Sequence, residues 1–219
     1  MTDAPSVISS SFELHNSEAA SPQWRRLAGI DSRLEAVMSA LPSRMRLAQD
    51  APLPEGETVG FASTTVLDGP LPVPAGVSKG VEVTRLTHSF FARTFQGSNG
   101  QQLAACGTVL EAPGTDFKVT DAFVLEAHGN DLLNATELVA TSANVLEERD
   151  GWWDALTGCL GRDCGGVCLS AALSCPKVNW AAFLLCLAGR CGVCVVKCAA
   201  CATCDCTWWC KWAAGCCDQ

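Results

Sequence analysis

The sequence predicts an α+β N-terminal domain, a helix over an antiparallel β-meander, followed by a small, disulfide-rich, mainly α-helical C-terminal domain. Three observations predict this. Apolar residues recur every three or four positions between residues 21 and 41, which is helical periodicity. From residue 57 the period changes to two, the period of half-buried strands. Of the 15 cysteines, only Cys106 precedes residue 158, so the C-terminal third has a different chemistry.

Charge divides the chain at the same place. The formal net charge is −8, from 15 Lys and Arg against 23 Asp and Glu. Residues 1–150 hold ten of these cations and nineteen of the anions, a net charge of −9, which leaves five against four, or +1, for residues 151–219. The acidity therefore belongs to the N-terminal part, and it gives no reason to expect a nucleic-acid partner for either part.

The N-terminal part begins with residues 1–20, which are polar and acidic and which we expect to be disordered. Ser21-Pro22 then predicts a helix start, and Pro42 a helix stop. One apolar stripe lies between them: Leu27, Ile30, Leu34, Val37 and Leu41. This basic helix either recognises a processing or export factor or packs on the sheet; the apolar stripe favours packing.

About five strands follow in the predicted domain 21–147. Alternating apolar residues mark the runs 57–67, 81–94, 101–110, 117–125 and 136–146. The turn sequences Gly-Ser-Asn-Gly at 97–100 and Ala-Pro-Gly-Thr at 112–115 predict hairpins and hence antiparallel pairing. Cys106 lies within one of these runs and is expected to be a buried, unreactive side chain.

The sequence predicts no enzyme. Its three histidines are far apart, and it has no P-loop, nucleophile elbow or HExxH motif. We therefore expect no catalytic residues and no cofactor. Residues 148–157 are predicted to be a linker with a cleavage site, because the charged segment 147–151 ends in glycine.

The domain 158–219 is organised by its cysteines. Cys164, Cys168 and Cys175 fall on one predicted helix face, and the cysteines from Cys191 to Cys204 on another. Cysteines on one helix turn bond each other poorly, so the stripes predict disulfides between facing helices, with connectivity left open. The candidates are Cys159, Cys164, Cys168, Cys175, Cys186, Cys191, Cys194, Cys198, Cys201, Cys204, Cys206, Cys210, Cys216 and Cys217.

Metal binding is the alternative use of these cysteines. Two Cys-x2-Cys pairs, Cys191 with Cys194 and Cys201 with Cys204, match the ligands of a four-cysteine zinc site. The high content of Trp, Phe and Leu in the same segment favours disulfides, since it predicts a packed core. A further pattern, Trp208, Trp209, Lys211 and Trp212, is typical of contact with a membrane interface or another target.

Four stretches resemble the halocin C8-like bacteriocin precursors: Thr-Gly-Cys at 157–159, Cys-Gly-Gly-Val-Cys at 164–168, the cysteine-rich run 186–194, and Lys-Trp-Ala-Ala-Gly-Cys-Cys at 211–217. The resemblance covers about a third of the chain. It implies that the C-terminal part is released as a disulfide-stabilised antimicrobial peptide, and that the acidic N-terminal part serves as leader or as self-immunity protein.

The resulting hypothesis is a bacteriocin precursor that is cytoplasmic before export and whose C-terminal peptide is secreted. Its expected partners are its own N-terminal domain or an immunity protein, a processing protease and exporter, and the envelope of a competitor cell. The alternatives are a cytosolic metal-binding or redox protein and a secreted structural protein without toxicity. Residues 1–20 lack the apolar core of a secretory signal, and no apolar run reaches the length of a membrane span.

Overall fold

The computed structural model describes residues 5–48, 51–71, 82–97, 100–142, 145–149 and 151–203. Seven strands form one sheet in which every strand pairs antiparallel with the next along the chain. The sheet is therefore a meander, as predicted from the hairpin turns. Its strands are β1 (Val7–His15), β2 (Glu57–Leu67), β3 (Arg85–Gln96), β4 (Gln101–Glu111), β5 (Lys118–His128), β6 (Thr136–Ser142) and β7 (Val145–Glu148).

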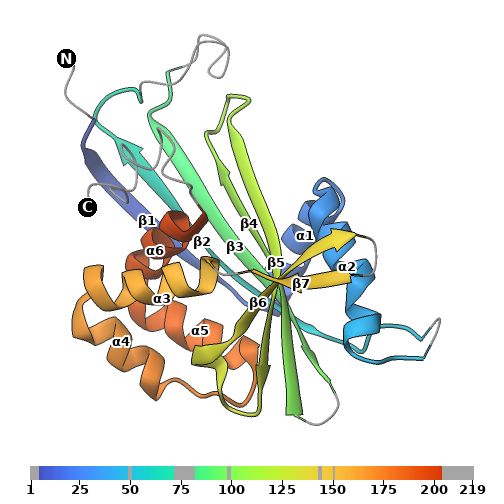
Figure 1. Ribbon diagram of the computed structural model, residues 1–219. Helices are drawn as coiled ribbons and strands as arrows, with labels where there is room; N and C mark the ends of the chain where they lie inside the picture. The colour runs from blue at the N-terminus through green and yellow to red at the C-terminus, as the bar shows by residue number, and fades with distance from the viewer. Residues whose placement is uncertain are drawn as a thin grey trace.

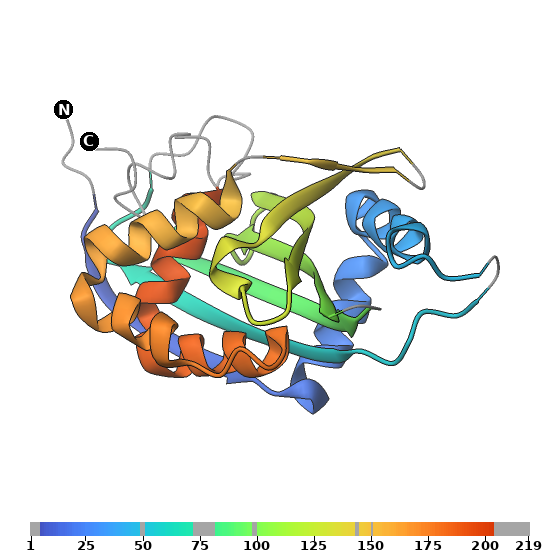
Figure 2. The same cartoon turned by 60° about the horizontal axis from the view of Figure 1, so that its bottom comes forward.

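Helices cover both faces of this sheet (Figures 1 and 2). On one face lie α1 (Ser17–Ala28) and α2 (Ser32–Arg44), and on the other lie α3 (Trp152–Asp163), α4 (Gly165–Ser174), α5 (Trp180–Cys191) and α6 (Val193–Thr203). A short 3-10 helix, η2 (Leu132–Asn134), joins β5 to β6. The C-terminal helices thus do not stand apart from the N-terminal part; they form the second outer layer of a three-layer molecule.

Strand periodicity produces the two cores. Successive residues of a strand point to opposite faces, so Phe90 of β3 packs under the C-terminal helices while Phe91 packs under α1 and α2. The same alternation separates Phe123 from Val124 on β5. Strand β4 is buried along almost its whole length, because both of its faces are covered.

The N-terminus differs from the prediction. Residues 7–15, expected to be disordered, form strand β1, whose backbone pairs with β2 from Val7 to His15. This is an edge strand whose side chains are mostly exposed, so its order comes from backbone hydrogen bonds and not from an apolar pattern. The predicted boundary at residue 20 is therefore wrong.

The predicted single helix is two helices. Asn16 caps α1 five residues before the predicted start, with its side chain accepting a hydrogen bond from the backbone of Ala19 at 3.1 Å. Asp31 caps α2 in the same way, and Ile30 in the break between them is exposed. Pro42 does not stop α2, which continues to Arg44. The helices pack on the sheet, as the apolar stripe predicted, and Arg44 binds Glu126 of β5 at 2.7 Å.

The predicted boundaries after residue 80 also shift. The run 81–94 is the strand Arg85–Gln96, and the run 136–146 is divided into β6 and β7. The predicted linker 148–157 is short, because β7 continues to Glu148 and α3 begins at Trp152. Gly151 precedes that helix with a φ of 153°, a conformation that favours glycine.

Candidate functional site

The C-terminal helices are joined by a ladder of four disulfides. The bonds are Cys159–Cys198, Cys164–Cys194, Cys168–Cys191 and Cys175–Cys186, with Cα–Cα distances of 5.5 to 6.0 Å. These distances are ordinary for disulfides. We refer to Cys159–Cys198 as the outer rung and to Cys175–Cys186 as the inner rung.

The ladder follows from cysteine spacing on antiparallel helices. The rungs span 39, 30, 23 and 11 residues, so each is nested within the one before. One cysteine of each rung lies in or beside α3 and α4, and the other in α5 or α6. The predicted stripes therefore bond across facing helices, as expected. Cys201 is disulfide-bonded as well.

The alternative zinc set is not assembled as free thiols in the described part of the chain. Cys191, Cys194 and Cys201 are all in disulfides, and Cys204 lies outside the described residues. A different trio, Cys164, Cys168 and Cys194, has sulfur atoms within 4.8 Å of one another, because two neighbouring rungs meet there. These three could bind a soft metal ion only as reduced thiolates.

Several predicted site residues lie outside the described residues, and the structure does not test them. They are the disulfide candidates Cys204, Cys206, Cys210, Cys216 and Cys217, and the membrane or target contacts Trp208, Trp209, Lys211 and Trp212.

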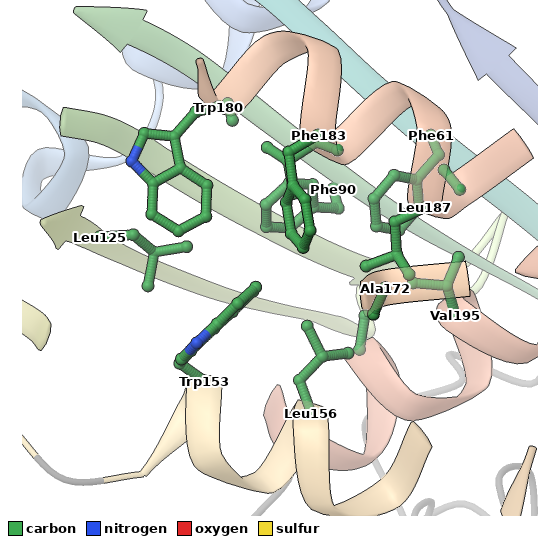
Figure 3. Packing of buried hydrophobic residues seen from close by; sticks show 14 of the residues in the cluster. Phe61, Phe90, Leu125, Trp153, Leu156, Ala172, Trp180, Phe183, Leu187 and Val195 are labelled. Atoms are coloured by element: carbon green, nitrogen blue, oxygen red, sulfur yellow. The ribbon is translucent and has the colours of Figure 1, made fainter. Parts of the chain in front are cut away.

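An aromatic interface joins the helices to the sheet (Figure 3). Trp153 of α3 meets Trp180 of α5 edge to face, with ring centroids 5.5 Å apart, and Phe183 lies 6.1 Å from Trp180. Trp152 stacks on Phe90 of β3 at 5.3 Å. Each aromatic pair of this kind adds roughly 0.5 to 1.5 kcal/mol beyond its buried area.

Two of the buried tryptophans donate their indole N–H groups to the N-terminal part of the protein. Trp153 donates to the carbonyl of Leu133 at 3.1 Å, and Trp180 donates to the carbonyl of Gln102 at 3.2 Å. Both acceptors belong to the N-terminal part. These bonds fix the position of α3 and α5 on the sheet, which an apolar contact alone would not do.

A buried carboxylate holds the junction between the two parts. Glu137 of β6 accepts hydrogen bonds from the backbone N–H groups of Trp152 at 2.6 Å and Trp153 at 3.3 Å. Gly151 has no side-chain acceptor to cap α3, so Glu137 supplies the cap from the sheet. Arg149 completes this group by binding Glu137 through its Nε at 2.7 Å and Asp121 at 3.0 Å.

Asp121 and Glu137 stabilise the positively charged form of Arg149. Burial works against its charged form, but hydrogen bonds to Asp121 and Glu137 and their negative charge together raise the pKa of Arg149. No sequence pattern predicts this arrangement, because Glu137 lies in β6 and Arg149 follows β7, twelve residues later. The segment predicted to be an open linker is anchored at its centre.

His88 lies under α6 on the same face of the sheet as Phe90. The residue is 4% exposed, and neither of its ring nitrogens has a hydrogen-bond partner among the described residues. Burial lowers the pKa of His88 to about 4, and the backbone of Val196 opposes this only in part. The imidazole is therefore neutral at pH 7. Cys106, also on this face, is free and fully buried, and burial raises the pKa of its thiol.

Among the described helices, none is by itself long and apolar enough to cross a membrane. Helices α5 and α6 reach that length and composition together, but they are bent by 112° at the break between them.

Comparison of the sequence with protein-family models, curated proteins and solved structures found no match. The resemblance to halocin C8-like precursors therefore depends on the four stretches quoted above.

Proposed function

We propose that the chain is a bacteriocin precursor whose C-terminal helices become a disulfide-stabilised antimicrobial peptide after cleavage at the junction. The observation that carries this proposal is the placement of the crosslinks. All four rungs lie between Cys159 and Cys198, on one side of Gly151. A cut at residues 148–151 would leave no rung of this ladder bridging the two fragments.

The sheet supports a second part of the proposal, in which the N-terminal domain keeps the peptide inactive. It covers the aromatic face that contains Trp153, Trp180 and Phe183, all of which are buried. Once released, the peptide would expose these side chains, and large apolar surfaces commonly mark sites of membrane or protein contact. In this proposal the N-terminal domain is leader and self-immunity cover in one molecule.

The disulfides also bear on location. Crosslinks of this number are typical of proteins from oxidising environments, and we propose that the peptide is secreted after synthesis of a cytoplasmic precursor. The partners in this proposal are a protease that cuts the junction, an exporter, and the envelope of the target cell.

The test combines mass and activity. Intact mass of species in the culture medium, with and without reduction, should reveal a peptide that begins near residue 150 and gains about two mass units per rung. The oxidised peptide should inhibit the growth of a competitor strain, and added N-terminal domain should neutralise it. A chain found only inside cells, carrying stoichiometric zinc or iron and free thiols, would overturn the proposal.

A further inference from the structure

Helix α4 leaves an apolar face exposed. Val167 is 76% exposed and Leu173 60%, and Val178, which follows the helix, is 67% exposed. Leu169 of the same helix is 46% exposed. Helix α4 contains no charged residue, which is unusual for a helix with so much of its surface in water.

The ladder determines which side of α4 faces the rest of the helical layer. Cys168 bonds Cys191 of α5, and the buried residues Ala171, Ala172 and Cys175 follow on the same side of α4 at helical spacing. By the same spacing Leu173 points away from this buried side, and Val167 and Leu169 lie on its two flanks, where both are exposed. Figures 1 and 2 place α4 at the outer edge of the helical layer, away from the strands.

Positive charge borders this face. Between Gly165 and Thr203 there are three cations, Lys177, Arg190 and Lys197, and no Asp or Glu. Two of them are held at the end of α4, where Lys177 donates to the carbonyl of Leu173 at 2.7 Å and Arg190 donates to the hydroxyl of Ser174 at 2.6 Å. A shallow groove of about 530 Å³, lined by Val167, Ser174 and Arg190 among others, connects the apolar face to the cation.

We propose that the α4 face, defined as Val167, Leu169, Leu173 and Val178, docks on an anionic phospholipid bilayer. Apolar side chains flanked by Lys and Arg are the combination that enters a lipid interface, where the chains bury apolar surface and the cations meet lipid phosphates. This inference rests on the proposed function, and it specifies an anionic phospholipid bilayer as the surface that the peptide targets. The face is exposed while the aromatic face is covered, so docking does not require cleavage.

The experiment therefore uses the full-length oxidised chain. Sedimentation with phosphatidylglycerol vesicles should show binding, and sedimentation with phosphatidylcholine vesicles should show little. The double variant Val167→Glu/Leu173→Glu should bind at least about tenfold more weakly, and Arg190→Gln about fivefold more weakly. These side chains are exposed, so the variants should fold normally.

A matched control places the same charges elsewhere. Ile8 and Ile30 are 65% and 58% exposed in the N-terminal part, and Ile8→Glu/Ile30→Glu should retain binding. Equal loss in the control, equal binding to both lipids, or a stable dimer of the full chain buried through α4 would each overturn the proposal. If the chain docks on lipid but is never cleaved, the lipid-docking inference stands and the proposed function is refuted. If a toxic peptide is released but the chain does not bind lipid, the proposed function stands and the lipid-docking inference is refuted.

Discussion

Protonation of His88 should loosen the contact between the sheet and the C-terminal helices. Its cross-strand neighbours, Ser63 on β2 and Leu110 on β4, carry no charge, and the neighbouring backbone on α6 belongs to Val196. A charged imidazole at this position would have no counter-ion among these neighbours in the described residues, so the folded state binds the proton more weakly than the unfolded chain does.

The magnitude follows from the shift of the pKa from 6.5 to about 4. Because the folded pKa is the lower one, the unfolded state binds more protons between these values, and stability falls as the pH decreases through this window. Linkage gives a loss of roughly 2 to 3 kcal/mol between pH 7 and about pH 4.5, approaching about 3 kcal/mol at still lower pH. Well above pH 6.5 His88 is neutral in both the folded and the unfolded state, so it contributes no pH dependence to stability there.

The assay is urea unfolding of the full chain and of His88→Leu across this pH range. Carboxylates also titrate there, so the difference between the two proteins isolates the imidazole. We expect the stability of His88→Leu relative to the native chain to rise by roughly 2 to 3 kcal/mol as the pH decreases from 7 to about 4.5. Parallel pH profiles for the two proteins would refute a buried, unpaired His88.

Three further predictions concern the junction, the ladder and the sheet. Glu137→Gln should cost roughly 1.5 to 3 kcal/mol of stability and speed limited proteolysis at the junction, because it removes the charged acceptor shared by Arg149 and the first turn of α3; unchanged cleavage would contradict this. Because the rungs are nested, the neighbouring rung still crosslinks the chain when the outer or the inner rung is removed. Removing either rung therefore frees only a short additional loop in the unfolded state. Paired alanine substitutions at each should lower the free energy of unfolding by similar amounts, roughly 2 to 3 kcal/mol, and a difference above about 1 kcal/mol would contradict nesting. Gly107→Ala would place a methyl group 2.5 Å from Leu27 and should cost roughly 1 to 3 kcal/mol in thermal or urea unfolding, whereas Gly161→Ala, with open space around it, should be neutral or stabilising.

The sequence was informative wherever a pattern repeated within one element. The period of two located the central strands, and the two cysteine stripes predicted bonds between facing helices. These patterns arise from local geometry, because a strand alternates its faces and a helix repeats its face every three or four residues. The buried state of Cys106 was predicted for the same reason.

Features that depend on tertiary pairing had no such pattern. Strand β1 is an exposed edge held by its backbone, so its polar side chains gave no sign of order. Glu137 is a strand residue whose role is set by a helix that begins fifteen residues later. The covering of the sheet by the C-terminal helices was missed because cysteine density suggested a module that is stable alone. The large aromatic content of that segment was the available signal, since Trp152 and Trp180 are buried against residues of the strands.

Two kinds of interaction therefore hold the C-terminal helices, and they respond to different conditions. The rungs join α3 and α4 to α5 and α6 within the helical layer, so they preserve the shape of that layer and depend on redox state. Aromatic packing and the cap from Glu137 hold the layer to the sheet. This attachment also requires His88 between the two layers to be neutral, so it depends on pH as well as on an intact junction. Because no described rung crosses between the layers, acid or a cut at the junction weakens the attachment without undoing the crosslinked shape. Under the proposed function, release of a folded peptide from its covering domain would require that the crosslinks within the helical layer and its attachment to the sheet be independent in this way.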